Sequence, residues 1–210
     1  MESFNQIHSE RIKFIKNNAN KDHIILQGGN NVLVSAPHGV EQVRLGKHKV
    51  KEIGSIATAL FLQNNTNSYL IAKTKNNFDD ANFDEESPYK KSLLKCVEKN
   101  DIKYVIDIHG LAEKREMDIN FGTNLGRNIQ TNEQAFEKLY RTLIENNFIV
   151  SIDQPFMGGG KTISNFIKQT KQDVFSLQIE INCAITNKQE NFDKYQSLLK
   201  ILTHWLNHLK

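Results

Sequence analysis

Short apolar segments typical of buried strands alternate with longer segments of helical periodicity along most of this chain. The segments expected to be strands are 69–72, 104–108, 117–121, 148–150 and 174–181, and those expected to be helices are 50–62, 88–97, 135–144, 161–167 and 192–209. Strands that alternate with helices tend to pair in parallel, and right-handed crossovers then place helices on both faces of the sheet. The alternation therefore predicts an α/β fold of three layers, helix, sheet and helix, with a mostly parallel mixed sheet.

The N-terminal part of the chain departs from this alternation. A short amphipathic helix is expected near residues 12–15. Two apolar segments, 23–27 and 32–36, then flank the run Gly28-Gly29-Asn30-Asn31, whose residues favour turns. The pattern predicts a hairpin in which these two strands pair with each other.

The length and charge of the chain limit the class of protein. With 210 residues, the chain has the size of one large domain, so we expect a single domain over residues 1–210. Its 27 basic and 24 acidic residues are interspersed and leave a formal charge of only +3, which argues against a nucleic-acid-binding face. No apolar stretch approaches the ~20 residues that span a bilayer. We therefore expect neither nucleic acid nor membrane as a partner.

Cysteine usage and the first residues favour a cytoplasmic protein. Cys96 and Cys183 lie in apolar runs without a CxxC motif or a Cys/His cluster, so both are expected to be buried free thiols. The chain does not open with the charged, apolar and small-residue pattern of a signal peptide. Free thiols persist in reducing compartments, of which the cytoplasm is the commonest.

Polar residues occur near the ends of three segments that are otherwise typical of buried strands. The strands that end near residues 36 and 108 run into His38 and His109, and the last strand carries Glu180 between two isoleucines. Ligands of open α/β sheets bind beyond the carboxyl ends of the strands, so these three side chains are placed to meet in one pocket. A buried carboxylate such as Glu180 is costly without a charged partner, which favours a functional site over a structural explanation.

The residues around the two histidines are compatible with a metal site. His38 and Glu41 form a His-x-x-Glu motif, whose spacing allows both side chains to reach one ion, and His109 would be the third ligand. Two histidines and one carboxylate, with a fourth position left to water, is a known composition of catalytic zinc sites. Asp107 lies two residues before His109 and therefore on the same face of the strand, where it could orient the His109 ring or hold a neighbouring loop. The structural alternative is that His38 caps a turn, Glu41 is solvated and His109 forms a hydrogen bond in the core.

Five short motifs carry a resemblance to a known family. They occur in this order: Val34–Gly39, Phe78–Asn82, Val105–Gly110, Phe156–Gly159 and Leu177–Ile181. Together they resemble the N-formylglutamate amidohydrolase family, and through it the wider group of zinc carboxypeptidases, aspartoacylases and phage poly-γ-glutamate hydrolases. The resemblance implies a phosphorylase/hydrolase-like fold and one Zn²⁺ per chain, held by His38, His109 and an acidic residue, with Glu180 as the carboxylate that activates water. We expect Glu41 to be the acidic ligand, with Glu52 as the rival, because members of this family vary in how far the acid follows the first histidine.

One motif departs from the family pattern. Related enzymes often have an arginine after the Asp-x-Asn of the second motif, where it binds a substrate carboxylate, but Asp80-Ala81-Asn82 is followed here by Phe83. A phenyl ring cannot replace a guanidinium group as a bidentate anion ligand. A neutral or aromatic acyl substrate is one consequence. We expect Asp80 and Asn82 to contribute to substrate binding, and the alternative is that they only brace their loop. If the substrate is anionic, the candidates for binding it are Arg44, Arg127 and Lys161.

These observations lead to a hypothesis about function. We expect a zinc-dependent amidohydrolase that cleaves an N-formyl or N-acyl amino acid or a γ-glutamyl-type amide, with a small molecule or a short peptide as substrate. Glu180 would take a proton from the metal-activated water and return it to the leaving amine, and Arg44 or Arg127 would stabilise the oxyanion. The alternatives are a peptidase similar to zinc carboxypeptidases, and a non-catalytic relative that binds a metal or another ligand.

A competing signal is the run Gly158-Gly159-Gly160-Lys161-Thr162, which is similar to a phosphate-binding loop. That motif requires a glycine where this chain has Pro155. We therefore expect the glycines to let the backbone approach the pocket, with Lys161 near its rim.

Overall fold

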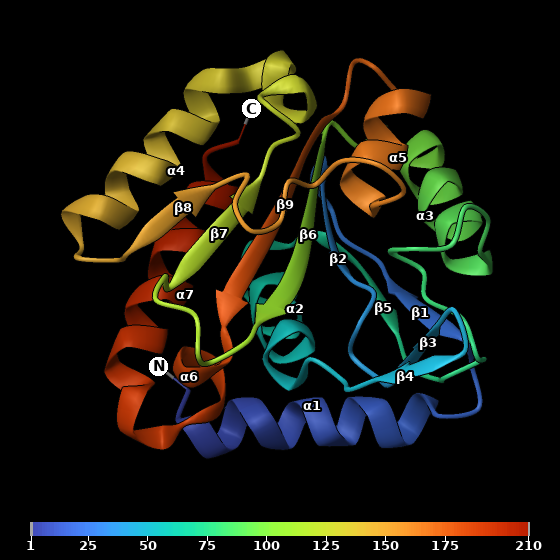
Figure 1. Cartoon of the computed structure of the whole chain (residues 1–210), viewed down its shortest axis with the longest axis horizontal. Coiled ribbons are helices and arrows are strands. Elements are labelled where there is room, and N and C mark those ends of the chain that lie inside the picture. The colour runs from blue at the N-terminus through green and yellow to red at the C-terminus, as the bar shows by residue number, and fades with distance from the viewer. Residues whose placement is uncertain (1, 210) are drawn as a thin grey trace.

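The computed structural model describes residues 2–209, and its central feature is a seven-stranded sheet (Figure 1). The order of the strands is β1-β5-β2-β6-β9-β7-β8, which runs from right to left in Figure 1. Their bounds are β1 (His23–Leu26), β2 (Val32–Ala36), β5 (Tyr69–Lys73), β6 (Tyr104–Leu111), β7 (Ile119–Gly122), β8 (Val150–Ile152) and β9 (Phe175–Asn182). Only the pairs β1–β5 and β7–β9 are antiparallel within this sheet. The expectation of a mostly parallel mixed sheet is therefore confirmed.

Helices cover both faces of the sheet, as the alternation predicted. One face packs against α1 (Phe4–Asn18), α2 (Ile53–Thr66), α4 (Glu133–Glu145), α6 (Cys183–Asn187) and α7 (Phe192–Asn207). The other face packs against α3 (Pro88–Lys99) and α5 (Ile163–Thr170). Two short 3-10 helices, η1 (Arg127–Asn132) and η2 (Gln189–Asn191), precede α4 and α7. None of the helices in residues 2–209 is both long and apolar enough to cross a membrane.

The two faces of the sheet differ in polarity. Successive side chains of a strand point to opposite faces, so one set from each strand meets α2 and α7 and the other set meets α3 and α5. The first set is apolar along the whole of β9, where Phe175, Leu177, Ile179 and Ile181 share one face as expected. The second set is apolar only near the amino ends of β2 and β6 and becomes polar toward their carboxyl ends. This polar part of the second face positions the candidate site.

Local sequence explains where the main helices begin. The Ser87 side chain accepts a hydrogen bond from the backbone N–H of Lys90, and Pro88 occupies the first turn of α3, which confirms the expected cap. Helix α2 begins directly after Glu52 and approaches α6 very closely at Gly54, where an added Cβ would lie 2.0 Å from Thr186 Oγ1. Only glycine permits this approach.

The expected pairing of the first two strands is wrong. β5 lies between β1 and β2, with β1 antiparallel to it and β2 parallel to it. The two glycines between β1 and β2 do not form a hairpin turn. A Cβ on Gly28 would lie 2.4 Å from the carbonyl carbon of Ser68, so these glycines allow the chain to pass the segment before β5.

Several short or polar elements were not predicted. The first helix extends from Phe4 to Asn18, well beyond the expected segment 12–15, and is capped by Ser3. A separate two-stranded hairpin consists of β3 (Gln42–Arg44) and β4 (Lys47–Lys49), joined by Leu45 and Gly46, both of which have positive φ. This hairpin lies beyond the carboxyl end of β2, on the lower right in Figure 1. It therefore lies at the end of the sheet where the carboxyl ends of β2 and β6 meet, which is also the end that carries the candidate site.

Candidate metal centre

Three segments bring two histidines and a carboxylate together at the carboxyl ends of β2 and β6. His38 follows β2, Glu52 immediately precedes α2, and His109 lies near the end of β6. Because β2 and β6 are neighbouring parallel strands, their carboxyl ends meet at one edge of the sheet. The potential ligand atoms of the three residues all lie within 4.8 Å of one another, and both histidines are buried.

The Nδ1 atoms of the two histidines and the carboxylate of Glu52 face a common point. His38 Nδ1 lies 2.8 Å from Glu52 Oε1, and His109 Nδ1 lies 3.3 Å from Glu52 Oε2. The two Nδ1 atoms are 3.2 Å apart. The Glu52 carboxylate is itself held by the backbone N–H of Gly110, which donates to Oε2 over 2.9 Å.

The outer nitrogens of both histidines are bound by carboxylates. His38 Nε2 lies 2.9 Å from Asp80 Oδ1, and His109 Nε2 lies 2.9 Å from Asp107 Oδ2. If each Nε2–H donates to its carboxylate, the lone pair of each ring is on Nδ1 and points to the common point. Two facing lone pairs and a carboxylate repel one another unless a cation lies between them. The donor set therefore fits a metal ion, and two imidazoles with one carboxylate is a composition that suits zinc.

His38, Glu52 and His109 form the candidate metal site, which is called the metal cluster below. The pKa values of these three residues reflect their close packing. Burial alone lowers the pKa of His38, but the charge of Glu52 and the hydrogen bond to Asp80 outweigh it and raise the pKa to about 9. Burial likewise opposes protonation of His109, and the charges of Asp107 and Glu52 raise its pKa well above the usual value. Burial raises the pKa of Glu52, but the two histidines more than offset this and hold it well below its usual range. The surrounding carboxylates thus favour positive charge at this point, which a bound cation would supply.

Glu180 lies beside this cluster on β9. It is the register partner of His109 on the adjacent parallel strand, so both side chains project from the same face of the sheet. Glu180 is 5% exposed, and burial raises its pKa to about 8, although the charge of His109 opposes the rise. Its Oε1 accepts a hydrogen bond of 2.9 Å from Gln178 Nε2. A carboxylate next to the ligand set but outside it is the arrangement expected of a general base.

Asp107 is held by a buried polar network. Ser35 Oγ donates to Asp107 Oδ1 over 2.7 Å and lies 3.0 Å from the hydroxyl of Tyr89. The Tyr89 hydroxyl in turn donates to the carbonyl of Ile71. With one oxygen bound to Ser35 and the other to His109, Asp107 fixes the orientation of the His109 ring.

Asp80 and Asn82 have different places in the loop that follows β5. Asp80 connects the metal cluster to Arg44, since its Oδ2 accepts from both Nε and an Nη of Arg44 over 2.8 Å. Asn82 Oδ1 instead accepts from the backbone N–H of Ile163 over 2.7 Å, at the start of α5. Asn82 therefore braces the loop against α5, which is one of the alternatives that the sequence left open.

Phe83, which directly follows Asn82, has two cations near its ring. The guanidinium carbon of Arg44 is 4.8 Å from the centre of the ring, and Lys161 Nζ is 5.8 Å from it. Lys161 is half exposed and lies 3.6 Å from a carboxylate oxygen of Glu85. Two of the three expected anion-binding residues, Arg44 and Lys161, thus lie next to the ring of Phe83.

The structure places Glu41 outside the cluster, so its choice as the acidic ligand over Glu52 is corrected. Glu41 is exposed in the turn between β2 and β3. The backbone N–H of Glu52 donates to the carbonyl of His38 over 2.9 Å and closes a loop that contains the β3–β4 hairpin. This closure brings Glu52, and not Glu41, next to the His38 ring.

Arg127 is also remote from the metal cluster, contrary to expectation. Because β7 runs antiparallel to β9, the chain after β7 returns toward the amino ends of β6 and β9, at the top of Figure 1. Arg127 lies there in η1, exposed, and lines a polar cavity of about 620 Å³ together with α5 residues such as Asn165 and Lys168. None of the residues that line this cavity belongs to the metal cluster.

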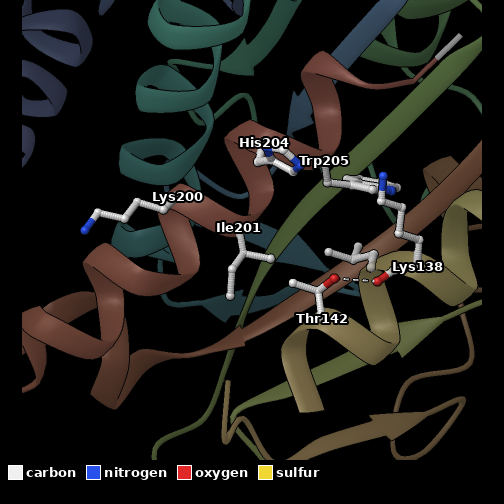
Figure 2. Close-up of a pocket in the computed structure, with 7 residues that line it drawn as sticks. Lys138, Thr142, Lys200, Ile201, His204 and Trp205 are labelled. Carbon is white, nitrogen blue, oxygen red and sulfur yellow. Dashed lines mark hydrogen bonds between the residues drawn. The ribbon is translucent and has the colours of Figure 1, made fainter. Parts of the chain in front are cut away.

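A further cavity, of about 240 Å³, lies between α4 and α7. Figure 2 shows Ile201 and Trp205 of α7 facing Lys138 and Thr142 of α4 across it. The Trp205 indole N–H is already bound to the carbonyl of Ala135. This cavity shares no lining residue with the metal cluster.

Comparison with known proteins supports the fold. No protein-family model and no curated protein sequence matches the chain. Its structure is similar to that of N-formylglutamate amidohydrolase from Ralstonia eutropha JMP134, with a TM-score of 0.62 and 13% identity over 89% of this chain and 96% of that one. It is also similar to a bacteriophage poly-gamma-glutamate hydrolase, with a TM-score of 0.55 and 11% identity over 92% of this chain and 93% of that one.

The similarity extends to larger enzymes. A metallo-carboxypeptidase from Burkholderia cenocepacia matches with a TM-score of 0.52 and 12% identity, over 95% of this chain but 66% of the carboxypeptidase. At such identities the likeness establishes the fold. The hydrolase-like α/β fold implied by the sequence resemblance is therefore confirmed.

Proposed function

We propose that this chain is a zinc-dependent amidohydrolase that cleaves the amide bond of an N-formyl or N-acyl amino acid or of a γ-glutamyl-type compound. The observation that carries the proposal is the position of Glu180, a buried carboxylate opposite His109 in register and outside the ligand set of His38, Glu52 and His109. The fold, which is similar to that of an N-formylglutamate amidohydrolase and a poly-gamma-glutamate hydrolase, supports the choice of amide substrates.

His38, Glu52 and His109 would hold the zinc ion, with Asp80 and Asp107 fixing the orientation of the two imidazole rings. Bound zinc supplies Lewis acidity, which polarises a carbonyl oxygen and lowers the pKa of water toward ~7. Two imidazoles and one carboxylate leave a coordination position open, as catalytic sites require.

Glu180 would act as the general base and then as the general acid. It accepts a proton from the attacking water and donates it to the nitrogen of the leaving amine. Burial raises its pKa to about 8 in the protein without metal, and added positive charge nearby favours the ionised form that a base needs. The same burial makes the protonated form a competent acid near neutral pH.

Arg44 would bind an anionic group of the substrate. Asp80 holds the guanidinium group against Phe83 next to the metal cluster, and the Arg44 side chain is still 31% exposed. Lys161, which also lies near the ring of Phe83, would add a second positive charge. This pair takes over the role of the arginine that the family resemblance leads one to expect at position 83, and it favours substrates with a free carboxylate.

A peptidase activity is the second candidate, because the fold is also that of metallo-carboxypeptidases. Carboxypeptidase substrates differ in that a peptide bond next to a free C-terminus is cleaved. Both reactions would use the same ligands and the same base, so the size of the leaving group distinguishes them.

The proposal is tested by zinc analysis and hydrolysis assays on the purified full chain. We expect one zinc per chain and turnover of N-formyl, N-acetyl or γ-glutamyl amino acids, with C-terminal dipeptides as the comparison. Glu180→Gln should keep the zinc and lose about 10²–10⁴-fold in kcat, whereas His109→Ala should lose the zinc. Glu41→Gln, at an exposed carboxylate, is the matched control and should change neither. Full activity of Glu180→Gln would remove the base assignment, and zinc without any turnover would favour a binding protein.

A further inference from the structure

Gln178 supports Glu180 in the same way that Asp107 supports His109. In each strand, the residue two positions earlier projects from the same face and forms a hydrogen bond with the functional side chain. The two bonds have the same length, 2.9 Å from Gln178 Nε2 to Glu180 Oε1 and 2.9 Å between His109 Nε2 and Asp107 Oδ2. Asp107 and Gln178 are register partners, so the two supporting residues are neighbours as well.

The position of Gln178 is not explained by stability. Its side chain is buried, at 2% exposure, and its Oε1 has no hydrogen-bond partner among residues 2–209. An amide that is buried with an unpaired acceptor costs free energy that an apolar side chain of similar size would avoid. The bond to Glu180 is the only side-chain hydrogen bond of Gln178 in the described part of the chain.

The neighbouring strand β7 does not provide another hydrogen bond to the Glu180 carboxylate in the described residues. Its neighbour on β7 is Asn120, whose amide is bound to Ser151 and to the carbonyl of Gln154. The only side-chain hydrogen bond of Glu180 within residues 2–209 is the one to Oε1, so Oε2 has no such partner there. The carboxylate is therefore anchored through Oε1 alone, and Oε2 is left for proton transfer.

We propose that Gln178 is a positioning residue that fixes the carboxylate of Glu180 for proton transfer, an inference that rests on the proposed amide hydrolysis. With Oε1 held by Gln178, Oε2 takes the proton from water as the water oxygen bonds to the carbonyl carbon. The same oxygen then gives the proton to the amine nitrogen as the C–N bond breaks. Without Gln178, the carboxylate can rotate away from the line of transfer.

The test uses Gln178→Met in the zinc-loaded full chain, with Gln178→Leu as a second variant. We expect kcat to fall about 10- to 100-fold with KM within about twofold, because removal of a supporting hydrogen bond affects the chemical step. The zinc content should not change, and the melting temperature should stay the same or rise, because an unpaired amide oxygen has been removed. A structural role would instead lower the melting temperature.

Ser176→Ala is the matched control. Ser176 lies on the same face of β9, two residues before Gln178, is fully buried and has an Oγ without a partner in the described residues, but it does not contact Glu180. Its removal should leave kcat unchanged. A Gln178→Met enzyme with wild-type kcat, or one in which kcat and the melting temperature fall together, would overturn the inference.

Crystal structures of the wild type and Gln178→Met separate this inference from the proposed function. We expect one orientation of the Glu180 carboxylate in the wild type and several in the variant, with His38, Glu52 and His109 unmoved. If the wild type hydrolyses none of the amides but this difference is found, the proposed function fails and the positioning role stands. If the wild type is active and Glu180 keeps its orientation in the variant, the positioning role fails and the function stands.

Discussion

Replacement of Glu180 by glutamine is predicted to stabilise the metal-free protein by an amount that grows with pH. Burial raises the pKa of Glu180 from its usual 4.5 to about 8. A carboxyl group with a raised pKa is protonated in both states below pH 4.5, so it costs nothing there. Between the two pKa values the unfolded chain loses the proton and the folded chain keeps it, and folding becomes less favourable as the pH rises. Glutamine does not ionise and avoids this cost.

The size of the effect follows from the two pKa values. Each pKa unit corresponds to about 1.4 kcal/mol, so a rise from 4.5 to about 8 corresponds to about 5 kcal/mol at most. The value of about 8 already includes the opposing charges of His109 and His38, and because the folded protein relaxes around a buried charge we expect a gain of about 2 to 5 kcal/mol above about pH 8. For a domain of 210 residues this corresponds to a melting temperature higher by roughly 4–20 °C.

The assay is thermal or urea unfolding of chelator-treated wild type, Glu180→Gln and Glu41→Gln at about pH 5, 7 and 9. The difference between wild type and Glu180→Gln should be small at the lowest pH and largest at the highest. The exposed Glu41 should give no pH-dependent difference. A difference that stays constant across this range, or that reverses sign, would show that Glu180 is not kept protonated by burial.

Asp107→Asn weakens the acceptor for His109 Nε2, so we expect zinc affinity to fall about 10- to 100-fold in equilibrium dialysis. Unchanged affinity would contradict the orienting role of Asp107. Arg44→Lys keeps the charge but loses the planar fork, and the KM of carboxylate-bearing substrates should rise roughly 10-fold while that of neutral amides stays the same. Equal effects on both kinds of substrate would argue against an anion site. Gly54→Ala places a Cβ 2.0 Å from Thr186 Oγ1, so calorimetry should give a lower melting temperature, which Thr186→Gly in the same chain should partly restore. A Gly54→Ala protein as stable as the wild type would mean that α2 and α6 separate at no cost.

The sheet and its main helices could be predicted because they depend on local apolar periodicity. Helix α2 and strand β9 are examples, since the spacing of their apolar residues alone distinguishes 3.6 from 2.0 residues per repeat. The pairing of β1 with β5 could not be predicted in this way. It depends on which strand inserts next to β2. The sequence Gly28-Gly29 is also compatible both with a hairpin turn and with the close approach to the segment before β5 that the structure shows.

The candidate site was only partly accessible from the sequence. His38, His109 and Glu180 could be identified because polar residues at the carboxyl ends of buried strands conflict with an apolar core. Glu52 could not be preferred to Glu41 from the sequence. Its position next to His38 depends on a backbone hydrogen bond to His38 that closes the loop containing the β3–β4 hairpin. The position of Arg127 depends on the direction of β7, which local periodicity does not encode.

Gln178 was missed although a signal existed. It lies two residues before Glu180, as Asp107 lies two residues before His109, and both are polar residues in buried strands. A search for polar residues at i and i+2 in buried strands would have found both pairs.

The closed loop between His38 and Glu52 has a consequence for how this chain can be altered. Both ends of the loop carry candidate metal ligands and are tied by one backbone hydrogen bond. The hairpin between them, residues 42–49, lies outside the seven-stranded sheet and is joined to the loop after β5 by the backbone hydrogen bond from Val43 to Asp79. Arg44 is carried on this hairpin. Exchange of residues 45–49 alone would leave the contacts from Arg44 to Asp80 and from Asp80 to His38 in place while changing the surface beside them, which makes this part of the hairpin the natural place for loop grafting and directed evolution.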